Sequence, residues 1–334
     1  EPANLLAHNS DLIIAIGTRL TDFTTSSKTG FNKAKIININ VSSLDSWKLD
    51  GMSVVGDAKL VIESLHKELE NEGYKTSEDY QKKVIQCKST WQSELERLYL
   101  SDYSNSLSQT VVLGLLNDFL SEDDLIIAAA GSLPGDLHKL WKSKGLNTYH
   151  LEYGFSCMGY EVAAGLGAAI ARNKGDIYVL CGDGSFLMNH SELYTCIREQ
   201  IKINVIVFDN SGFQCINNLQ QNLGQIKYGN SFNSRDQKTG KLDGDIAKID
   251  FSKYAKALGA SSFSANNIVQ VKQALHKAKK ATSSTVIDIK VTADSMTGAY
   301  HSFWRVDVPE VSNSISVRKR ELLCKENIDL ARDY

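Results

Sequence analysis

The sequence lacks the features that would assign it to a membrane or to a nucleic-acid partner. Its longest apolar runs, such as residues 12–16 and 125–130, are far shorter than the roughly 20 residues that a membrane span needs. No signal peptide opens the chain. Lysine and arginine (37) nearly balance aspartate and glutamate (39), with no block of one sign, so binding to a polyanion has no electrostatic support. We expect no membrane and no nucleic acid among its partners.

The six cysteines form no C-x-x-C pair and show no spacing typical of a zinc site. Neither a disulfide framework nor structural zinc is therefore predicted, which favours a cytoplasmic protein. Cys181 stands within an apolar run and is expected to be a small buried hydrophobe.

Common catalytic signatures are also missing. No G-x-G-x-x-G follows the first predicted strand, which disfavours a nicotinamide dinucleotide site there, and neither G-x-S-x-G nor H-E-x-x-H occurs. The seven histidines do not cluster at ligand spacing. His150 and His190 could face a cleft, but a structural role is favoured for each.

The remaining pattern is an alternation of strands and helices, which predicts an α/β protein with doubly wound parallel sheets. Residues 1–75 form a first unit, with strands over 11–17 and 34–40 and a helix over 57–69 that Asp57 would cap. The first strand reads as fully buried. Residues 76–106 predict a surface helix followed by a linker.

Residues 107–334 predict a second and larger unit. Strands are expected over 124–130, 148–152, 177–181, 203–208 and 285–291, and helices over 111–120, 155–172, 188–200, 251–258 and 268–280. Ligands of such sheets collect outside the carboxyl ends of the strands.

The stretch with the strongest chemical signal follows the strand over 177–181. Asp183 stands between Gly182 and Gly184 at a strand-to-helix turn, where a carboxylate would repel a phosphate unless a divalent cation lay between them. Asn210 follows the next strand, 27 positions later, and its side chain would emerge at the same sheet edge. Either residue alone would be interpreted as part of an ordinary turn. The two together, at the ends of neighbouring strands, predict an Mg²⁺ site.

Two further segments lie near this edge. Gly159, Ala163 and Gly167 recur at every fourth position, which predicts a helix face open to close backbone approach, with Met158 just before it. The polar stretch 221–245 has no regular period and is expected to be a mobile loop that serves as a lid, a permanently loose insertion being the alternative.

Residues 182–185 followed by 209–210 resemble the diphosphate-binding motif of the thiamine-diphosphate enzymes, in the branch that contains acetolactate synthase and pyruvate oxidase. Residues 1–75 resemble the latter half of that family's Rossmann-like central domain, and 107–334 resemble its diphosphate-binding domain with a C-terminal tail. The longer strings 130–138, 152–161 and 209–220 resemble more specifically a branch that acts in myo-inositol catabolism.

The resemblance implies thiamine diphosphate and Mg²⁺ as cofactors. It implies that Asp183, Asn210 and the Gly212 carbonyl bind the metal. The implied contacts with thiamine diphosphate are Ser132, Leu133, Met158, Gly182, Asp183, Gly184, Ser185, Asn210 and Gly212. Among these, Gly184 and Ser185 match positions beside the diphosphate and pyrimidine, Met158 matches an apolar buttress that bends the cofactor, and Ser132 and Leu133 match a turn on its other side.

The implied activity is the hydrolysis of a carbon–carbon bond in a cyclic polyol 1,2-dione to 5-deoxy-glucuronate. A lyase or synthase acting on 2-keto acids and a non-catalytic α/β nucleotide-binding module remain alternatives. The resemblance also implies a homo-oligomer in which a glutamate on an N-terminal domain of a partner subunit activates the cofactor. The sequence begins without methionine and contains no such domain, so no catalytic residue is assigned and the chain is expected to be inactive alone.

Overall fold

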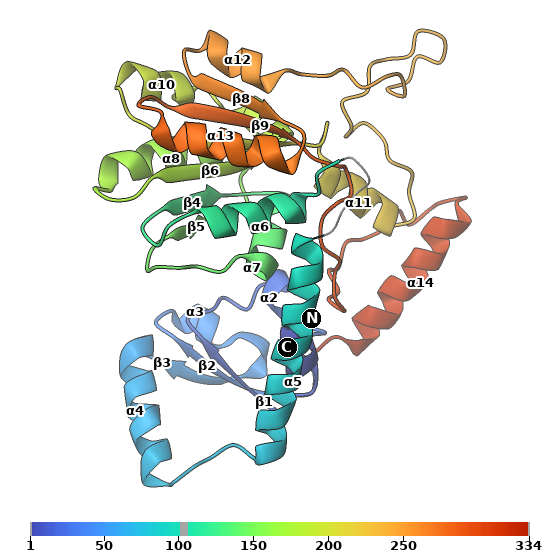
Figure 1. Ribbon diagram of the computed structural model, residues 1–334. Helices are drawn as coiled ribbons and strands as arrows, with labels where there is room; N and C mark the ends of the chain where they lie inside the picture. Colours follow the sequence, from blue (N-terminus) through green and yellow to red (C-terminus); the bar gives the residue numbers. More distant parts are fainter. Residues whose placement is uncertain (1, 101–105, 333–334) are drawn as a thin grey trace. The chain divides into compact units, whose positions relative to one another are not determined.

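The computed structural model describes residues 2–100 and 106–332 (Figure 1). The chain divides into two compact units: unit 1 comprises residues 1–94 and 298–334, and unit 2 comprises residues 95–297. Both contain parallel sheets with helices, which confirms the predicted fold class.

Unit 1 is built on a three-stranded parallel sheet of order β1-β2-β3. Its elements are α1 (Pro2–His8), β1 (Leu12–Ile16), α2 (Asp22–Thr25), β2 (Lys35–Asn40), α3 (Ser43–Ser46), the 3₁₀ turn η1 (Lys48–Asp50), β3 (Met52–Val55), α4 (Ala58–Asn71), most of α5 (Glu78–Tyr99) and α14 (Ile315–Leu330). Asp57 caps α4 as predicted, because its carboxylate accepts from the Leu60 N–H at 3.1 Å.

The prediction that the first strand is fully buried is wrong. Leu12, Ile14 and Ile16 of β1 are 44%, 42% and 41% exposed. β1 hydrogen-bonds β2 alone within the described sheet, and α3 and α4 pack against the other two strands. The apolar run therefore predicted the strand correctly but not its surroundings.

The C-terminal segment groups with unit 1, whereas the sequence boundaries placed it in the second domain. The Arg332 N–H donates to the Lys28 carbonyl at 3.1 Å, and the Arg305 N–H donates to the Ser27 hydroxyl at 2.8 Å. The Asn32 side chain donates to the Leu330 carbonyl. Such long-range bonds leave no pattern in the local sequence. The expected linker falls on residues 101–105, which lie outside the described part of the chain.

Unit 2 holds a six-stranded, all-parallel sheet of order β5-β4-β6-β7-β9-β8. Its elements are α6 (Gln109–Phe119), β4 (Leu125–Ala128), α7 (Ser132–Leu140), β5 (Tyr149–Leu151), α8 (Tyr160–Ala171), β6 (Ile177–Gly182), α9 (Asp183–Met188), α10 (Glu192–Arg198), β7 (Asn204–Asp209), α11 (Gln214–Asn222), α12 (Phe251–Ala257), β8 (Ser261–Ala265), α13 (Ile268–Lys280) and β9 (Thr285–Lys290). The chain passes from β4 outward to β5 and returns on the other side as β6, which makes the β4–β6 pair a topological switch point.

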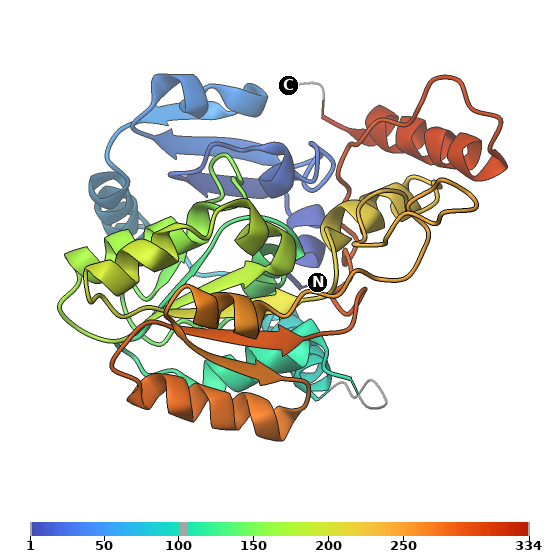
Figure 2. The same ribbon diagram turned by 90° about the horizontal axis from the view of Figure 1, so that it is seen from above.

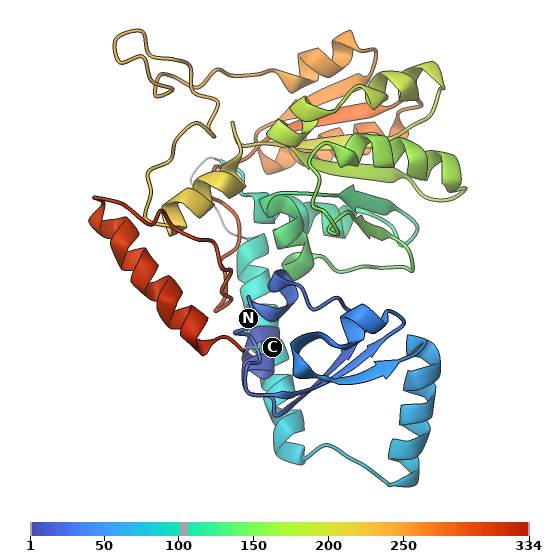
Figure 3. The same ribbon diagram turned by 180° about the vertical axis from the view of Figure 1, so that it is seen from behind.

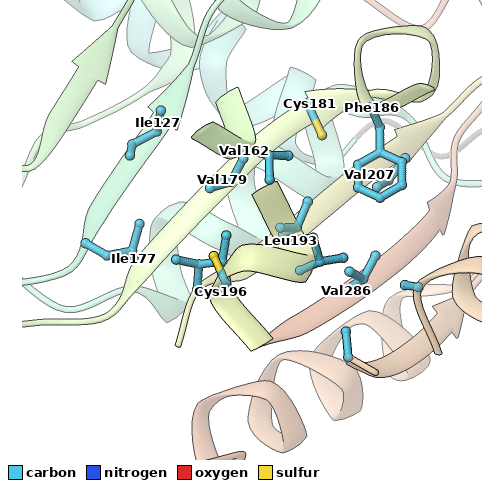
Figure 4. Close-up of a cluster of buried hydrophobic side chains, with 14 of the residues drawn as sticks. Ile127, Val162, Ile177, Val179, Cys181, Phe186, Leu193, Cys196, Val207 and Val286 are labelled. Carbon is cyan, nitrogen blue, oxygen red and sulfur yellow. The ribbon is translucent and has the colours of Figure 1, made fainter. Parts of the chain in front are cut away.

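Helices cover both faces of this sheet. Alternate residues of the strands, such as Val179, Cys181 and Val207, pack with Val162 of α8 and Leu193 of α10 in one core (Figure 4). Seen from behind, α8, α10 and α12 lie on this side of unit 2 (Figure 3). The fully buried apolar runs that the sequence showed are what a sheet covered on two faces requires.

Two predicted helices have different bounds. The expected helix 155–172 begins only at Tyr160, because Gly159 adopts a left-handed conformation (φ 87°) at its N-cap. The expected helix 188–200 begins only at Glu192, as α10, because Met188 ends the separate helix α9 and the chain leaves helical geometry at Asn189 (φ −155°). The α7 helix was missed, since Pro134 and Gly135 mask its pattern in the sequence.

Candidate functional site

The candidate site lies at the carboxyl ends of β4, β6 and β7, where Asp183 is the central side chain. It is 1% exposed and begins α9, directly after β6. One of its oxygens accepts from the Gly184 N–H at 2.7 Å, and the other accepts from the Asn210 and Gly212 N–H groups at 3.1 and 3.0 Å. The two loops that the sequence singled out are thus joined through this carboxylate.

Burial and then the neighbouring Asp209 raise the pKa of Asp183 to about 7, against the lowering effect of the backbone N–H groups. Asp209 is itself held in an ion pair with Lys290, whose ammonium also lies 2.9 Å from Asp288. No cation is paired with Asp183 among these contacts.

Asn210 supplies the second observation. Its amide oxygen is buried and accepts no hydrogen bond within the described residues. Buried polar atoms nearly always have a partner, and an unpartnered one calls for an explanation such as an ion. A carboxylate and an amide oxygen are hard oxygen donors of the kind Mg²⁺ takes, so the residues present fit this metal.

Glycines make room around this pair. A side chain at Gly184 would meet the Phe213 ring at 2.4 Å, and one at Gly212 would meet the Asn230 carbonyl at 2.5 Å. Gly212 also has φ +154°, at the limit of the region that glycine alone adopts freely. At Gly182, by contrast, a side chain would meet nothing within 4 Å. The backbone there faces open space that a ligand can approach.

The other predicted contacts come from neighbouring segments. Ser132 is the first residue of α7, after β4, and is half-buried, whereas the Leu133 side chain is buried in the core. Met158 is half-buried and precedes the N-cap of α8. The structure thus places these segments at the same end of the sheet as Asp183.

Glu161 is the residue that sequence reasoning missed. It is 2% exposed, and its carboxylate accepts from the Ser185 hydroxyl at 2.8 Å and from the Gly159 N–H at 3.0 Å. Burial raises the pKa of Glu161, and these hydrogen bonds oppose that rise. The signal was its position, since a glutamate among apolar and small residues at a helix start lies on the inner face.

The predicted stripe of small residues is wrong in its membership. Gly159 is the N-cap rather than part of the helix, and Gly167 is exposed, with nothing within 4 Å of a side chain placed there. Close packing occurs at Gly165, where a side chain would lie 2.4 Å from Val179 of β6. The close-packed position thus lies two residues, or about half a helical turn, from the predicted ones.

The two histidines have structural partners. His150 pairs with the Tyr160 hydroxyl at 2.8 Å, with the two rings stacked. His190 pairs through one ring nitrogen with the Phe186 carbonyl at 3.0 Å and through the other with the Tyr254 hydroxyl. Cys181 is 1% exposed, as expected.

The long segment 221–245 begins in α11 and then forms the excursion coloured yellow to orange in Figure 2. Its middle is tied to the predicted metal-binding loop: the Phe213 N–H donates to the Asn230 carbonyl at 2.7 Å, and the Phe232 N–H donates to the Ser211 carbonyl at 2.9 Å. The lid therefore stays a prediction, with an anchor at Asn230–Phe232 that the sequence did not reveal.

Two absences hold for residues 2–100 and 106–332. None of the helices there is long and apolar enough to cross a membrane. No group of three or more histidine, cysteine, aspartate or glutamate side chains is placed to hold a metal.

Comparison with known proteins decides the family. Residues 129–289 match the C-terminal TPP binding domain of thiamine pyrophosphate enzymes, and residues 1–65 match the central domain of the same enzymes. The chain belongs to the thiamine pyrophosphate enzymes. The matched region 129–289 contains every residue of the candidate site, so thiamine diphosphate is its cofactor.

Individual curated proteins are more specifically similar to this chain than the family models are. The chain is 44% identical over 358 residues to the 3D-(3,5/4)-trihydroxycyclohexane-1,2-dione hydrolase of Clostridium tetani. It is 45% identical over 358 residues to 3D-(3,5/4)-trihydroxycyclohexane-1,2-dione hydrolase 1 of Bacillus cereus. Each alignment covers 99% of this chain and 55% of the relative. The chain thus spans about half the length of the curated relatives it matches.

Proposed function

We propose that this chain is the cofactor-binding portion of a hydrolase that cleaves a carbon–carbon bond of a cyclic polyol 1,2-dione, giving 5-deoxy-glucuronate in myo-inositol catabolism. The observation that carries the proposal is 44–45% identity over 99% of the chain to relatives named for that substrate. We place this reaction in the cytoplasm, with a small molecule as the substrate.

Mg²⁺ is the second cofactor of the proposed enzyme. The buried Asp183 carboxylate and the unpartnered Asn210 oxygen would hold it, with the Gly212 carbonyl as a third protein ligand. Two positive charges there would neutralise Asp183 and attract a diphosphate that the carboxylate alone would repel.

Thiamine diphosphate, when bound, supplies a carbon that adds to a carbonyl and takes up the electrons of the broken carbon–carbon bond. The chain's own residues bind and orient it. Gly182 leaves space for close approach, Gly184 and Ser185 flank the group, and Met158 supplies an apolar contact near the strand ends. The loop anchored at Asn230–Phe232 would exclude water.

We also propose that the working enzyme is a homo-oligomer in which a glutamate outside this chain activates the cofactor, as the family resemblance implies. Sedimentation of the full-length enzyme tests this. A fully active monomer would refute it.

Calorimetry tests the cofactor proposal. Thiamine diphosphate should bind with Mg²⁺ and not in EDTA, and NAD should not compete. Asp183→Ala should weaken binding at least 100-fold, whereas Cys181→Ala, a change at a buried residue of β6 two positions earlier, should leave it within about threefold. Binding that persists in EDTA would refute the metal bridge. Turnover of 2-keto acids but not of the dione by the full-length enzyme would refute the substrate assignment.

A further inference from the structure

Glu161 is a buried carboxylate, and none of its hydrogen-bond partners among the described residues is a basic side chain. Its charge is met by donors alone: the Ser185 hydroxyl at 2.8 Å from both oxygens, and the backbone N–H groups of Gly159, Ala130 and Glu161 itself. An ionised group that is removed from water needs such donors, because burying it unpaired is costly. It also stands in the first turn of α8, where the helix dipole favours negative charge.

These donors come from three separate segments of the candidate site. Ala130 follows β4 and lies two residues before Ser132. Gly159 is adjacent to Met158, and Ser185 stands in α9, two residues after Asp183. One carboxylate therefore joins the three segments that carry most of the predicted cofactor contacts.

The same bonds fix what Ser185 can do. A serine hydroxyl has one proton and two lone pairs. Its proton is directed at Glu161, and one lone pair accepts from the Gly159 N–H at 2.8 Å. Only a lone pair is left for a bound molecule. Such an atom accepts an N–H, as from the amino group of the cofactor's aminopyrimidine, and cannot donate to a diphosphate oxygen.

We propose that Glu161 is a positioning residue of the cofactor site, which holds the β4, α8 and α9 segments together and presents Ser185 to the aminopyrimidine as a hydrogen-bond acceptor. The proposal rests on the cofactor assignment above and extends it. It divides the site into a metal and diphosphate half around Asp183 and an aminopyrimidine half around Glu161.

The test compares two ligands on the full chain with Mg²⁺ present: thiamine diphosphate and inorganic diphosphate. Glu161→Gln should raise the Kd of thiamine diphosphate about tenfold and leave that of inorganic diphosphate within about twofold, because the metal half is untouched. Ser185→Ala should do the same. The double variant should lose no more than the larger single loss, because Glu161 acts through Ser185.

Asp124→Asn is the matched control. Asp124 is also a buried carboxylate on the same sheet, 5% exposed, and accepts from the Ser121 and Asp176 N–H groups at 2.8 Å each. It precedes β4, at the opposite end of the strands, so its amide variant should lower stability without changing the Kd of thiamine diphosphate. Equal weakening of both ligands by Glu161→Gln, an unchanged Kd, additive losses, or an equal loss in Asp124→Asn would each overturn the proposal.

A cofactor-free measurement separates this inference from the proposed function. In Glu161→Ala, the Gly159 N–H should exchange with solvent at least tenfold faster than in the wild type, and the Val205 N–H in β7 should not. An unchanged Gly159 rate overturns the inference even without ligand. A full-length enzyme that binds no thiamine diphosphate refutes the proposed function, whereas an unchanged Gly159 rate refutes the positioning role of Glu161 independently of any ligand.

Discussion

The two parallel sheets of this chain are built from similar apolar strands but differ in burial. Every residue of β7 in unit 2 is buried, whereas three large apolar residues of β1 in unit 1 are more than 40% exposed. In unit 2, β7 lies between β6 and β9, with helices on both faces of the sheet. The sequence of a segment thus predicts that it forms a strand. How much that strand stabilises the protein depends on the elements that cover it.

The largest expected effect is a pair of core truncations that measures this difference. Ile206→Ala in β7 should cost about 2–5 kcal/mol, because Ile206 is 0% exposed and leaves a cavity. Ile14→Ala in β1 should cost about 1 kcal/mol, because the side chain is 42% exposed. Hydrogen exchange in urea measures the free energy of unfolding of each sheet, and so the loss that each substitution causes. Equal losses would show that β1 is covered in solution.

Ligand binding should sharpen the contrast between the units. Thiamine diphosphate with Mg²⁺ at about 100 times its Kd should stabilise unit 2 by about 2.7 kcal/mol. Protection should rise at the ends of β6 and β7 and not in β2, and EDTA should reverse the effect. Protection that rises equally in β2 would show that the two units unfold together.

Two glycines of α8 test the packing within unit 2. Gly165→Ala should destabilise by about 1–3 kcal/mol, because its new methyl meets Val179. Gly167→Ala should stabilise by up to about 1 kcal/mol, since the site is exposed and alanine favours the helix. Thermal unfolding compares the two. The same sign for both would contradict the observed register of α8 on β6.

The smallest expected effect is on pH dependence, confined to unit 2. The pKa of Asp183 is raised from 3.8 to about 7, so the metal-free folded state binds a proton more tightly than the unfolded state. Stability should therefore fall as pH rises from about 4 to 7, and thermal unfolding at several pH values measures the fall. Saturating Mg²⁺ or Asp183→Asn should remove this fall. A fall that persists in Asp183→Asn would assign it to another group.

Local patterns were sufficient for much of the fold and for the centre of the site. Apolar runs predicted β6 and β7, and glycine beside aspartate at a strand end predicted that the loops of Asp183 and Asn210 meet at one sheet edge. The features that the sequence did not predict depend on distant parts of the chain. They are the exposure of Ile14, the hydrogen bond between Asn230 and Phe213, and the hydrogen bonds that Glu161 makes with Ser185. These features arise from tertiary contacts, which the periodicity of the local sequence does not predict.

The unpartnered Asn210 oxygen has a consequence for evolution and engineering. A buried acceptor without a donor costs about 1–3 kcal/mol, so the metal-free fold carries a local frustration that the ion would relieve. Substitutions that satisfy this oxygen within the protein would raise the thermal stability of the chain and, on the proposed metal-binding role of Asn210, would remove a metal ligand. On that proposal, selection for stability and selection for metal binding would act in opposite directions at this one atom.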